Sequence, residues 1–283
     1  MQFSMKPQPI IWFAWRPQWW AGLPVLISLL GAGVAYGASR VALVFGPNIV
    51  LWVLLTLLAL VTCYVVILTR RQGLEALGVT ERNWPQAIGV GAVLGVMLGA
   101  LFGFRALAAG DVLVTPPLDM RLLALALSLA LMVACEEVFF RGWLQSSVEQ
   151  WLGVVPAVIL SSAAYTGFFL AFIAGAEALR AVIRTPAGHL LTLPQDAIVL
   201  LLVALFFGLV FRVTGNLLAS GAASFLSRFA LTFVFGTAEL ASASPALMLA
   251  VLLALGAVLT LYVWRWLNLA RPAPARSARK PRW

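Results

Sequence analysis

The sequence has little charge and almost no histidine. Only 10% of its 283 residues are charged, 63% are hydrophobic, and there is one histidine. Soluble domains carry about 25% charged residues, so we expect no sizeable soluble domain in this chain. The mean hydropathy of +1.00 indicates instead a protein that crosses a membrane many times.

Residues that bind metals are equally scarce. The two cysteines, Cys63 and Cys135, lie in separate apolar segments without zinc-knuckle spacing, and we interpret them as small buried residues. The single histidine, His189, lies in a predicted loop and is interpreted as an exposed residue. A net charge of +9 would suggest nucleic acid in a soluble protein, but no basic nucleic-acid stripe is visible, so we expect no such partner.

Long apolar runs make up most of the chain. A spanning helix needs about 20 apolar residues, and the sequence predicts eight of them in an all-α polytopic bundle. The predicted spans are 22–44, 47–69, 86–108, 121–142, 154–174, 196–212, 216–236 and 246–266. The sixth looks short and is expected to extend into the loop before it. No internal repeat is evident, which disfavours a transporter built from two matched halves.

The flanking segments and the charge distribution suggest an orientation. Residues 1–21 hold several tryptophans and are predicted to lie at the membrane interface, 22–269 form the transmembrane bundle, and 270–283 form a basic tail with prolines. Most lysines and arginines fall on one side of the predicted spans, which favours cytoplasmic termini in a bacterial-type inner membrane. The tail is expected to contact anionic lipid headgroups.

One helix end combines charge with an apolar setting. Residues 134–142 read Ala-Cys-Glu-Glu-Val-Phe-Phe-Arg-Gly and contain Glu136, Glu137 and Arg141. Ionisable groups at membrane depth are costly, so they are functional-site hypotheses. Glu137 and Arg141 are four residues apart and are expected to pair, while Glu136 points about 100° away, toward a cavity. The alternative is a structural Arg–Glu clamp at the helix end, with the second glutamate facing water.

The pattern Glu-Glu-x-x-x-Arg, followed here by Gly-Trp-Leu-Gln, resembles the motif of the CPBP (CAAX protease and bacteriocin-processing, or Abi) family of intramembrane proteases. Two further landmarks keep the family's order, namely Ser161-Ser162 and the turn from Arg212 to Leu217. The resemblance covers about 120–236 and implies a bundle of about eight helices with a site open to the cytoplasm. It implies that Glu136 activates water, helped by two histidines that bind metal, position the water or stabilise the oxyanion.

The sequence departs from the family at the remaining site positions. Phe169 stands at the first histidine, Ser224 at the second and Arg228 at the partner asparagine. A phenyl ring can neither bind metal nor move a proton, and serine is a poor zinc ligand, so we expect no cofactor and in particular no zinc. No lysine lies within a predicted span to serve as the base for a serine nucleophile.

Arg228 is the one cation well inside a predicted span. Such cations usually face the bundle interior and pair with an acid. We predict that Arg228 pairs with Glu136 or Glu137 and converts a hydrolytic site into a structural ion-pair core. The alternatives are that it reaches for water or pairs with Glu239.

Three smaller features carry structural predictions. Asn216 is predicted to cap the start of a helix. The Tyr165 hydroxyl is expected to bond a local partner rather than the glutamates. Close helix packing is predicted for the glycines of one span. They are Gly89, Gly91, Gly95, Gly99 and Gly103.

Together these observations predict a membrane protein with the family's fold but without its catalytic histidines. We expect it to bind helices of partner membrane proteins, or to act as a structural subunit or assembly factor of a membrane complex. The alternative is an active glutamate-dependent endopeptidase that cleaves hydrophobic or prenylated peptides, so enzymatic activity is left open. A solute transporter ranks last, because the spans offer few polar groups for a pathway.

Overall fold

The computed structural model of the chain describes residues 22–39, 47–69, 74–79, 84–108, 119–183 and 193–230, and within these ranges it contains helices and no strand. The helices are α1 (Leu23–Ala38), α3 (Pro47–Cys63) with the π-helix η2 (Tyr64–Thr69), the 3₁₀ turn η3 (Leu74–Leu77), α4 (Trp84–Ala108), α5 (Met120–Glu137), the π-helix η4 (Val138–Gln145), α6 (Ser146–Leu152), α7 (Val154–Ile183), α8 (Leu193–Thr214) and α9 (Leu217–Phe229).

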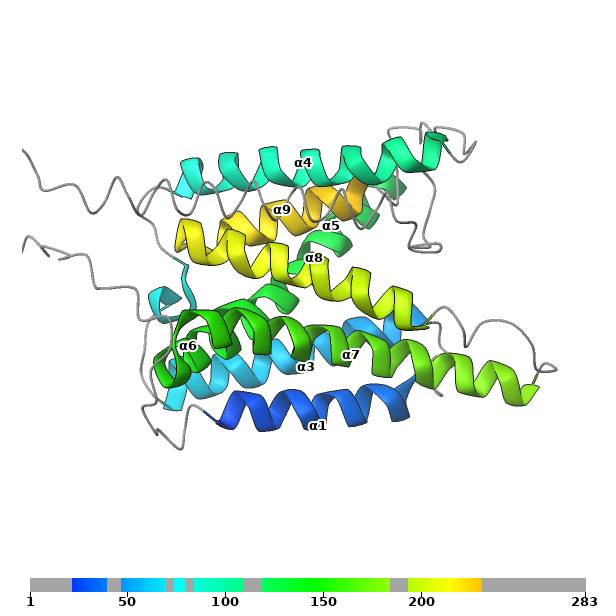
Figure 1. The fold of residues 1–283 in the computed structure, drawn as a ribbon, viewed down its shortest axis with the longest axis horizontal. Coiled ribbons are helices and arrows are strands. Elements are labelled where there is room, and N and C mark those ends of the chain that lie inside the picture. The colour runs from blue at the N-terminus through cyan, green and yellow to red at the C-terminus, as the bar shows by residue number, and fades with distance from the viewer. Residues whose placement is uncertain are drawn as a thin grey trace, which may run out of the picture.

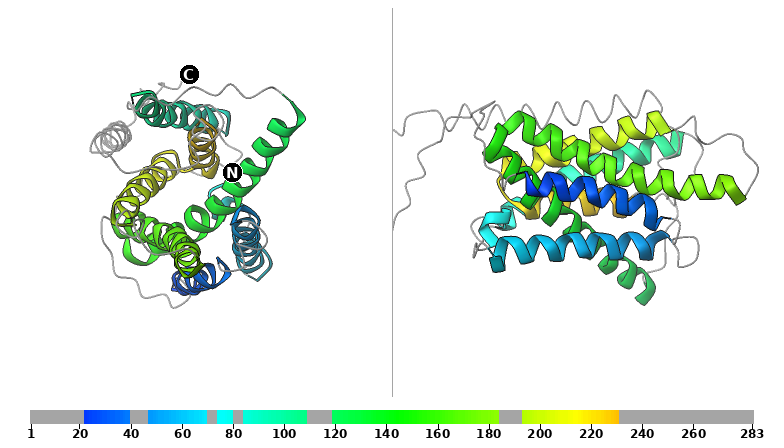
Figure 2. Two further views of the ribbon diagram at one scale, coloured as in Figure 1. Left: turned by 90° about the vertical axis from the view of Figure 1, so that its right-hand side faces the viewer. Right: turned by 90° about the horizontal axis from the view of Figure 1, so that it is seen from below.

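The long helices lie side by side and alternate in direction, as expected of a multi-pass membrane protein (Figure 1). Seen from one end, they follow a curve that α5 crosses obliquely (Figure 2). Within the described ranges, five helical segments are long and apolar enough to cross a membrane. The predicted all-α polytopic fold is therefore confirmed. The eighth predicted span, the two flanking segments, His189 and Glu239 lie outside the described residues.

Three helices run further than the sequence predicted. The helix that begins at α5 continues through η4 and α6 to Leu152, ten residues beyond the predicted end. Its last turns hold Gln145, Ser147 and Glu149, which lowered the local hydropathy without breaking the helix. Gly153 ends it, with a φ of 93° that favours glycine. Similarly, α7 continues to Ile183 and α8 begins at Leu193, which confirms that the sixth span extends into the preceding loop.

Glycines bring α4 against α9. A Cβ atom on Gly91 would lie 2.1 Å from the carbonyl oxygen of Ala219, and one on Gly95 would lie 2.6 Å from that of Ala223. Only glycine permits this approach, so the predicted close packing is confirmed here. By contrast, a Cβ on Gly89 would meet nothing within 4 Å. The contact fixes the position of α9, which carries several site residues.

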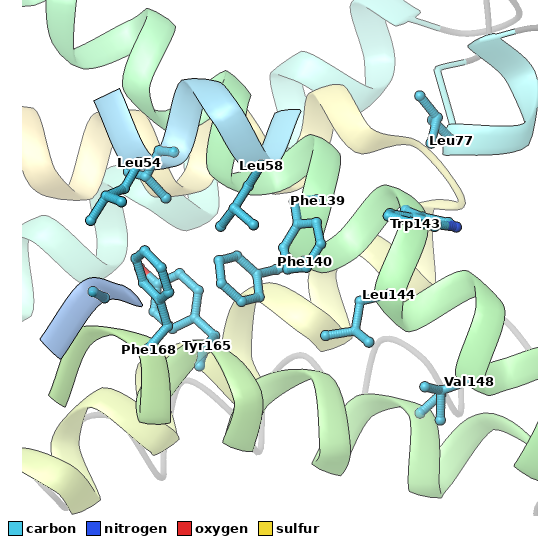
Figure 3. Close-up of a cluster of buried hydrophobic side chains, with 14 of the residues drawn as sticks. Leu54, Leu58, Leu77, Phe139, Phe140, Trp143, Leu144, Val148, Tyr165 and Phe168 are labelled. Atoms are coloured by element: carbon cyan, nitrogen blue, oxygen red, sulfur yellow. The ribbon is translucent and has the colours of Figure 1, made fainter. Parts of the chain in front are cut away.

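An aromatic cluster fills the space beside the glutamate helix. Phe139, Phe140 and Trp143 of η4 are buried together with Tyr165 and Phe168 of α7. Figure 3 shows the rings of Phe140, Tyr165 and Phe168 grouped between the two helices. The ring of Phe140 lies 5.1 Å from Tyr165 and 5.8 Å from Phe168, in edge-to-face arrangements. This packing sets the distance between α7 and the end of α5.

The turn between α8 and α9 follows its sequence signature. Gly215 has a φ of 63°, and the Asn216 side chain accepts a hydrogen bond from the Leu218 amide at 3.0 Å. Asn216 is therefore the N-cap that the sequence predicted. The cap starts α9 at the depth that places Arg228 three turns further along.

Candidate functional site

Both glutamates of the motif are buried inside the bundle. Glu136 and Glu137 occupy the last turn of α5, and their exposed fractions are 0% and 2%. Arg141 follows in η4 and is also fully buried. Charges at this depth need partners, so their contacts decide what the site does.

The guanidinium of Arg228 holds Glu136 with two hydrogen bonds. Its Nη1 lies 2.8 Å from Oε1 of Glu136, and its Nη2 lies 2.6 Å from Oε2. The two side chains are 22% and 0% exposed. The predicted pairing of Arg228 with one of the two glutamates is confirmed, and the partner is Glu136. This bidentate geometry is the strongest arrangement of an arginine with a carboxylate, and it ties α9 to α5.

Tyr165 joins the same pair from α7, contrary to the sequence prediction of a local partner. Its hydroxyl donates to Oε2 of Glu136 at 3.3 Å and accepts from Nη2 of Arg228. Phe169, one turn further along α7, packs against Tyr165 with ring centroids 4.6 Å apart and the ring planes tilted by 40°. Its ring centroid also lies 6.0 Å from Cζ of Arg228. Phe169 thus lies beside the ion pair, and its phenyl ring offers no group that binds metal or moves a proton.

Arg141 makes its hydrogen bond to α8 instead of Glu137. Its Nη2 donates to the carbonyl oxygen of Ala204 at 3.0 Å, and its Cζ lies 5.1 Å from the ring centroid of Tyr165. Among the described residues, Nε and Nη1 of Arg141 and Oε2 of Glu137 have no hydrogen-bond partner. The predicted pair was therefore wrong: Glu136 is the glutamate that an arginine holds. The reason is that Arg141 lies in a π-helical turn, from which its side chain extends into the space between α7 and α8.

Two serines of α9 face the glutamate helix. Ser220 donates to the Leu217 carbonyl at 3.1 Å and lies near Glu137. Ser224, one turn further along, is buried, and its hydroxyl has no protein partner. Ser224 therefore lies between Ser220 and Arg228 on the face of α9 that points to α5. The structure brings together every site residue that the sequence predicted.

The site is balanced in charge but unsuited to zinc. The carboxylates of Glu136 and Glu137 are offset by the guanidinium groups of Arg141 and Arg228. A zinc ion would need three or more ligands from His, Cys, Asp or Glu. Both oxygens of Glu136 are engaged by Arg228. Within the described ranges, no three such side chains come together.

Sequence reasoning missed two polar contributors, Ser220 and Gln145, and undervalued Tyr165. A signal was present in the spacing. Ser220, Ser224 and Arg228 are each four residues apart, which places them on one face of a helix. Glu137, Arg141 and Gln145 repeat the same spacing on the facing helix. Polar positions of this kind in apolar helices predict contacts with other helices, and in the structure Arg141 and Gln145 contact α8 while Arg228 contacts α5.

A comparison with protein families found a match. The family model described as Type II CAAX prenyl endopeptidase Rce1-like matches residues 118–230, which is less than half of the chain. The matched segment runs from the start of α5 to the end of α9 and contains every site residue above. Neither the curated proteins nor the solved structures gave a match.

Proposed function

We propose that this membrane protein, whose residues 118–230 match the Rce1-like CAAX prenyl endopeptidase model, is a member of that family in which the hydrolytic centre has become a structural ion-pair core. The bidentate contact of Arg228 with Glu136 carries this proposal. A general base must have a lone pair free to take a proton from water. Both oxygens of Glu136 already accept charge-assisted hydrogen bonds, so this glutamate is not available as that base.

The residues around the pair support the loss of hydrolysis. Phe169 and Ser224 stand at the positions of the family's histidines, and neither can act as a base or as a good zinc ligand. Arg228 replaces the neutral asparagine with a full positive charge. The same changes strengthen the bundle, because Glu136, Tyr165 and Arg228 connect α5, α7 and α9.

The role that fits such a core is non-catalytic. The protein would bind transmembrane helices of partner proteins, or serve as a structural subunit or assembly factor of a membrane complex. The charge asymmetry of the sequence supports a bacterial-type inner membrane with both termini in the cytoplasm. On this topology, the end of the bundle formed by α6 and the α8–α9 turn faces the cytoplasm.

A cleavage assay tests the proposal directly. The full chain, reconstituted in liposomes, is incubated with a prenylated CAAX peptide and with hydrophobic transmembrane peptides, and the products are read by mass spectrometry. We expect no cleavage by the wild type or by Glu136→Gln. Glu75→Gln, a change at an exposed glutamate of η3, is the matched control. The proposal would be overturned if the wild type and the control cleave a peptide and Glu136→Gln does not.

One observation favours the alternative, an active glutamate-dependent endopeptidase. Oε2 of Glu137 has no protein partner, so this carboxylate retains a free acceptor inside the bundle. If Glu137 served as the base, cleavage would persist in Glu136→Gln and disappear in Glu137→Gln. Running both variants in the same assay therefore separates the inactive member from an enzyme that uses the second glutamate.

A further inference from the structure

A row of polar side chains leads from the surface of the bundle to Glu137. The helix formed by α5, η4 and α6 carries Glu137, Arg141, Gln145 and Glu149 at intervals of four residues. The contacts of Arg141, Gln145 and Glu149 place these three side chains on the side of the helix that faces α8. The row spans twelve residues, from the last turn of α5 to α6.

Groups on α8 meet this row with the same spacing. Nη2 of Arg141 donates to the Ala204 carbonyl at 3.0 Å, and Nε2 of Gln145 donates to the Gly208 carbonyl at 3.0 Å. One turn further, Nη2 of Arg212 lies 3.1 Å from Oε1 of Glu149. Three successive polar contacts therefore join the two helices, and the last is partly exposed, with side chains 30% and 29% accessible.

A third helix, α7, completes the lining. Ser161 donates to Oε1 of Gln145 at 3.3 Å. A Cβ atom on Gly208 would lie 3.4 Å from the Ser162 hydroxyl, so that hydroxyl also faces the row. Thr166 lies one turn further along α7 and is buried. We call this set the polar column: Glu137, Arg141, Gln145, Glu149, Ser161, Ser162, Thr166 and Arg212.

The polar column contains six buried atoms without a hydrogen-bond partner among the residues that the structure describes. They are Oε2 of Glu137, Nε and Nη1 of Arg141, Oγ of Ser162, Oγ1 of Thr166 and Nε of Arg212. More than about 90% of buried polar groups in proteins have a partner, in the protein or in ordered water. Buried waters characteristically bridge such groups and make about three hydrogen bonds each. Six of the eight such atoms among the described residues belong to the polar column, and the other two are Oγ1 of Thr56 and Oγ of Ser224.

We propose that the polar column holds a file of water molecules that connects Glu137 with the α6 end of the bundle. The file enters beside Glu149 and Arg212 and ends at the glutamates. There, the Arg228–Glu136 pair and the ring of Phe169 close it. The water gives Glu137 and Arg141 the hydrogen bonds that the protein does not, and so allows two charges at membrane depth. This inference holds whether or not the chain hydrolyses peptides.

Water-edited solid-state NMR of the full chain in lipid bilayers tests the file. The arginines and phenylalanines are labelled with ¹⁵N, and the signals of Arg141 Nε and of the Phe140 amide are assigned by their loss in Arg141→Lys and Phe140→Leu. We expect polarisation to pass rapidly from water to Nε of Arg141. It should pass much more slowly to the backbone amide of Phe140, which lies in the aromatic cluster. Equal and slow transfer to both groups in the wild type would overturn the proposal without any variant.

Substitutions in α7 then test the path. The double variant Ser162→Ala with Thr166→Val removes one hydroxyl of the polar column and replaces the other with a methyl group of similar size. We expect transfer to Arg141 to fall to about half or less, because water loses two of its partners. Ser28→Ala is the control, since Ser28 is a buried serine of α1 outside the polar column. An Arg228 signal like that of the wild type shows that the site of the double variant is intact. In such a variant, unchanged polarisation transfer to Arg141 would contradict a path along α7.

Discussion

The fully buried Arg141 and the partly buried Arg228 lie beside the same pair of glutamates, yet their surroundings differ. Arg228 places its two terminal nitrogens on the two oxygens of Glu136. Arg141 gives one nitrogen to a backbone carbonyl, and its other two nitrogens have no partner in the protein. The first contact joins α5 to α9, whereas the second joins η4 to α8. Arg228 and Arg141 therefore carry the same charge but have different structural roles.

The difference concerns how each charge is stabilised. A buried ion pair depends on good geometry, and removing one partner leaves an uncompensated charge. Arg228 and Glu136 depend on each other in this way. Arg141 belongs to the polar column, where we propose that water supplies the missing hydrogen bonds. The same substitution in the two arginines should therefore have different consequences.

The largest expected effect is that of Arg228→Met. It leaves the fully buried Glu136 without its cation, and breaking such a pair costs about 3–5 kcal/mol. The free energy of unfolding in mixed micelles measures the loss. Adding Glu136→Gln should restore most of the stability, because the remaining group is then neutral. A double variant as unstable as Arg228→Met would show that Arg228 stabilises the bundle through contacts other than this pair.

Arg141→Met should cost less, about 1.5–3 kcal/mol, which is the usual value of a hydrogen bond to a charged group. The Ala204 carbonyl loses a donor, and Glu137 loses the positive charge nearby. The two arginine variants are compared in the same mixed micelles. If Arg141→Met proves as damaging as Arg228→Met, the contrast between a direct pair and a hydrated charge is wrong.

The position of Arg228 depends also on α4, which the glycine contact presses against α9. In Gly91→Ala, the new Cβ would meet the Ala219 carbonyl oxygen, and overpacking of this kind typically costs about 1–3 kcal/mol. Gly89→Ala is the control, because its Cβ would enter open space on the same helix. A thermal unfolding series of the two variants is sufficient. Equal stability would mean that α4 does not constrain α9.

The features of the site that follow from charge and residue spacing were mostly predicted from the sequence. Arg228 had to find an acid because it lies within an apolar span, and Asn216 had to begin a helix because it follows a glycine at a turn. The expected Glu137–Arg141 pair failed because a π-helical turn follows Glu137 and redirects the arginine. Spacing rules assume an α-helix, and nothing in the local composition indicates a change of helix type. Tyr165 was misjudged because its partners lie 29 and 63 residues away.

The smallest expected effect is that of Ser224→Ala, at the position of the family's second histidine. The buried hydroxyl of Ser224 has no protein partner, so its removal should change the free energy of unfolding by less than about 0.5 kcal/mol, or raise it slightly. Ser220→Ala, one turn away, should cost about 1 kcal/mol, because that hydroxyl bonds the Leu217 carbonyl. If Ser224→Ala costs as much as Ser220→Ala, Ser224 has a partner of its own. The side chain of Ser224 would then still contribute to the site, although it is not the histidine of the family.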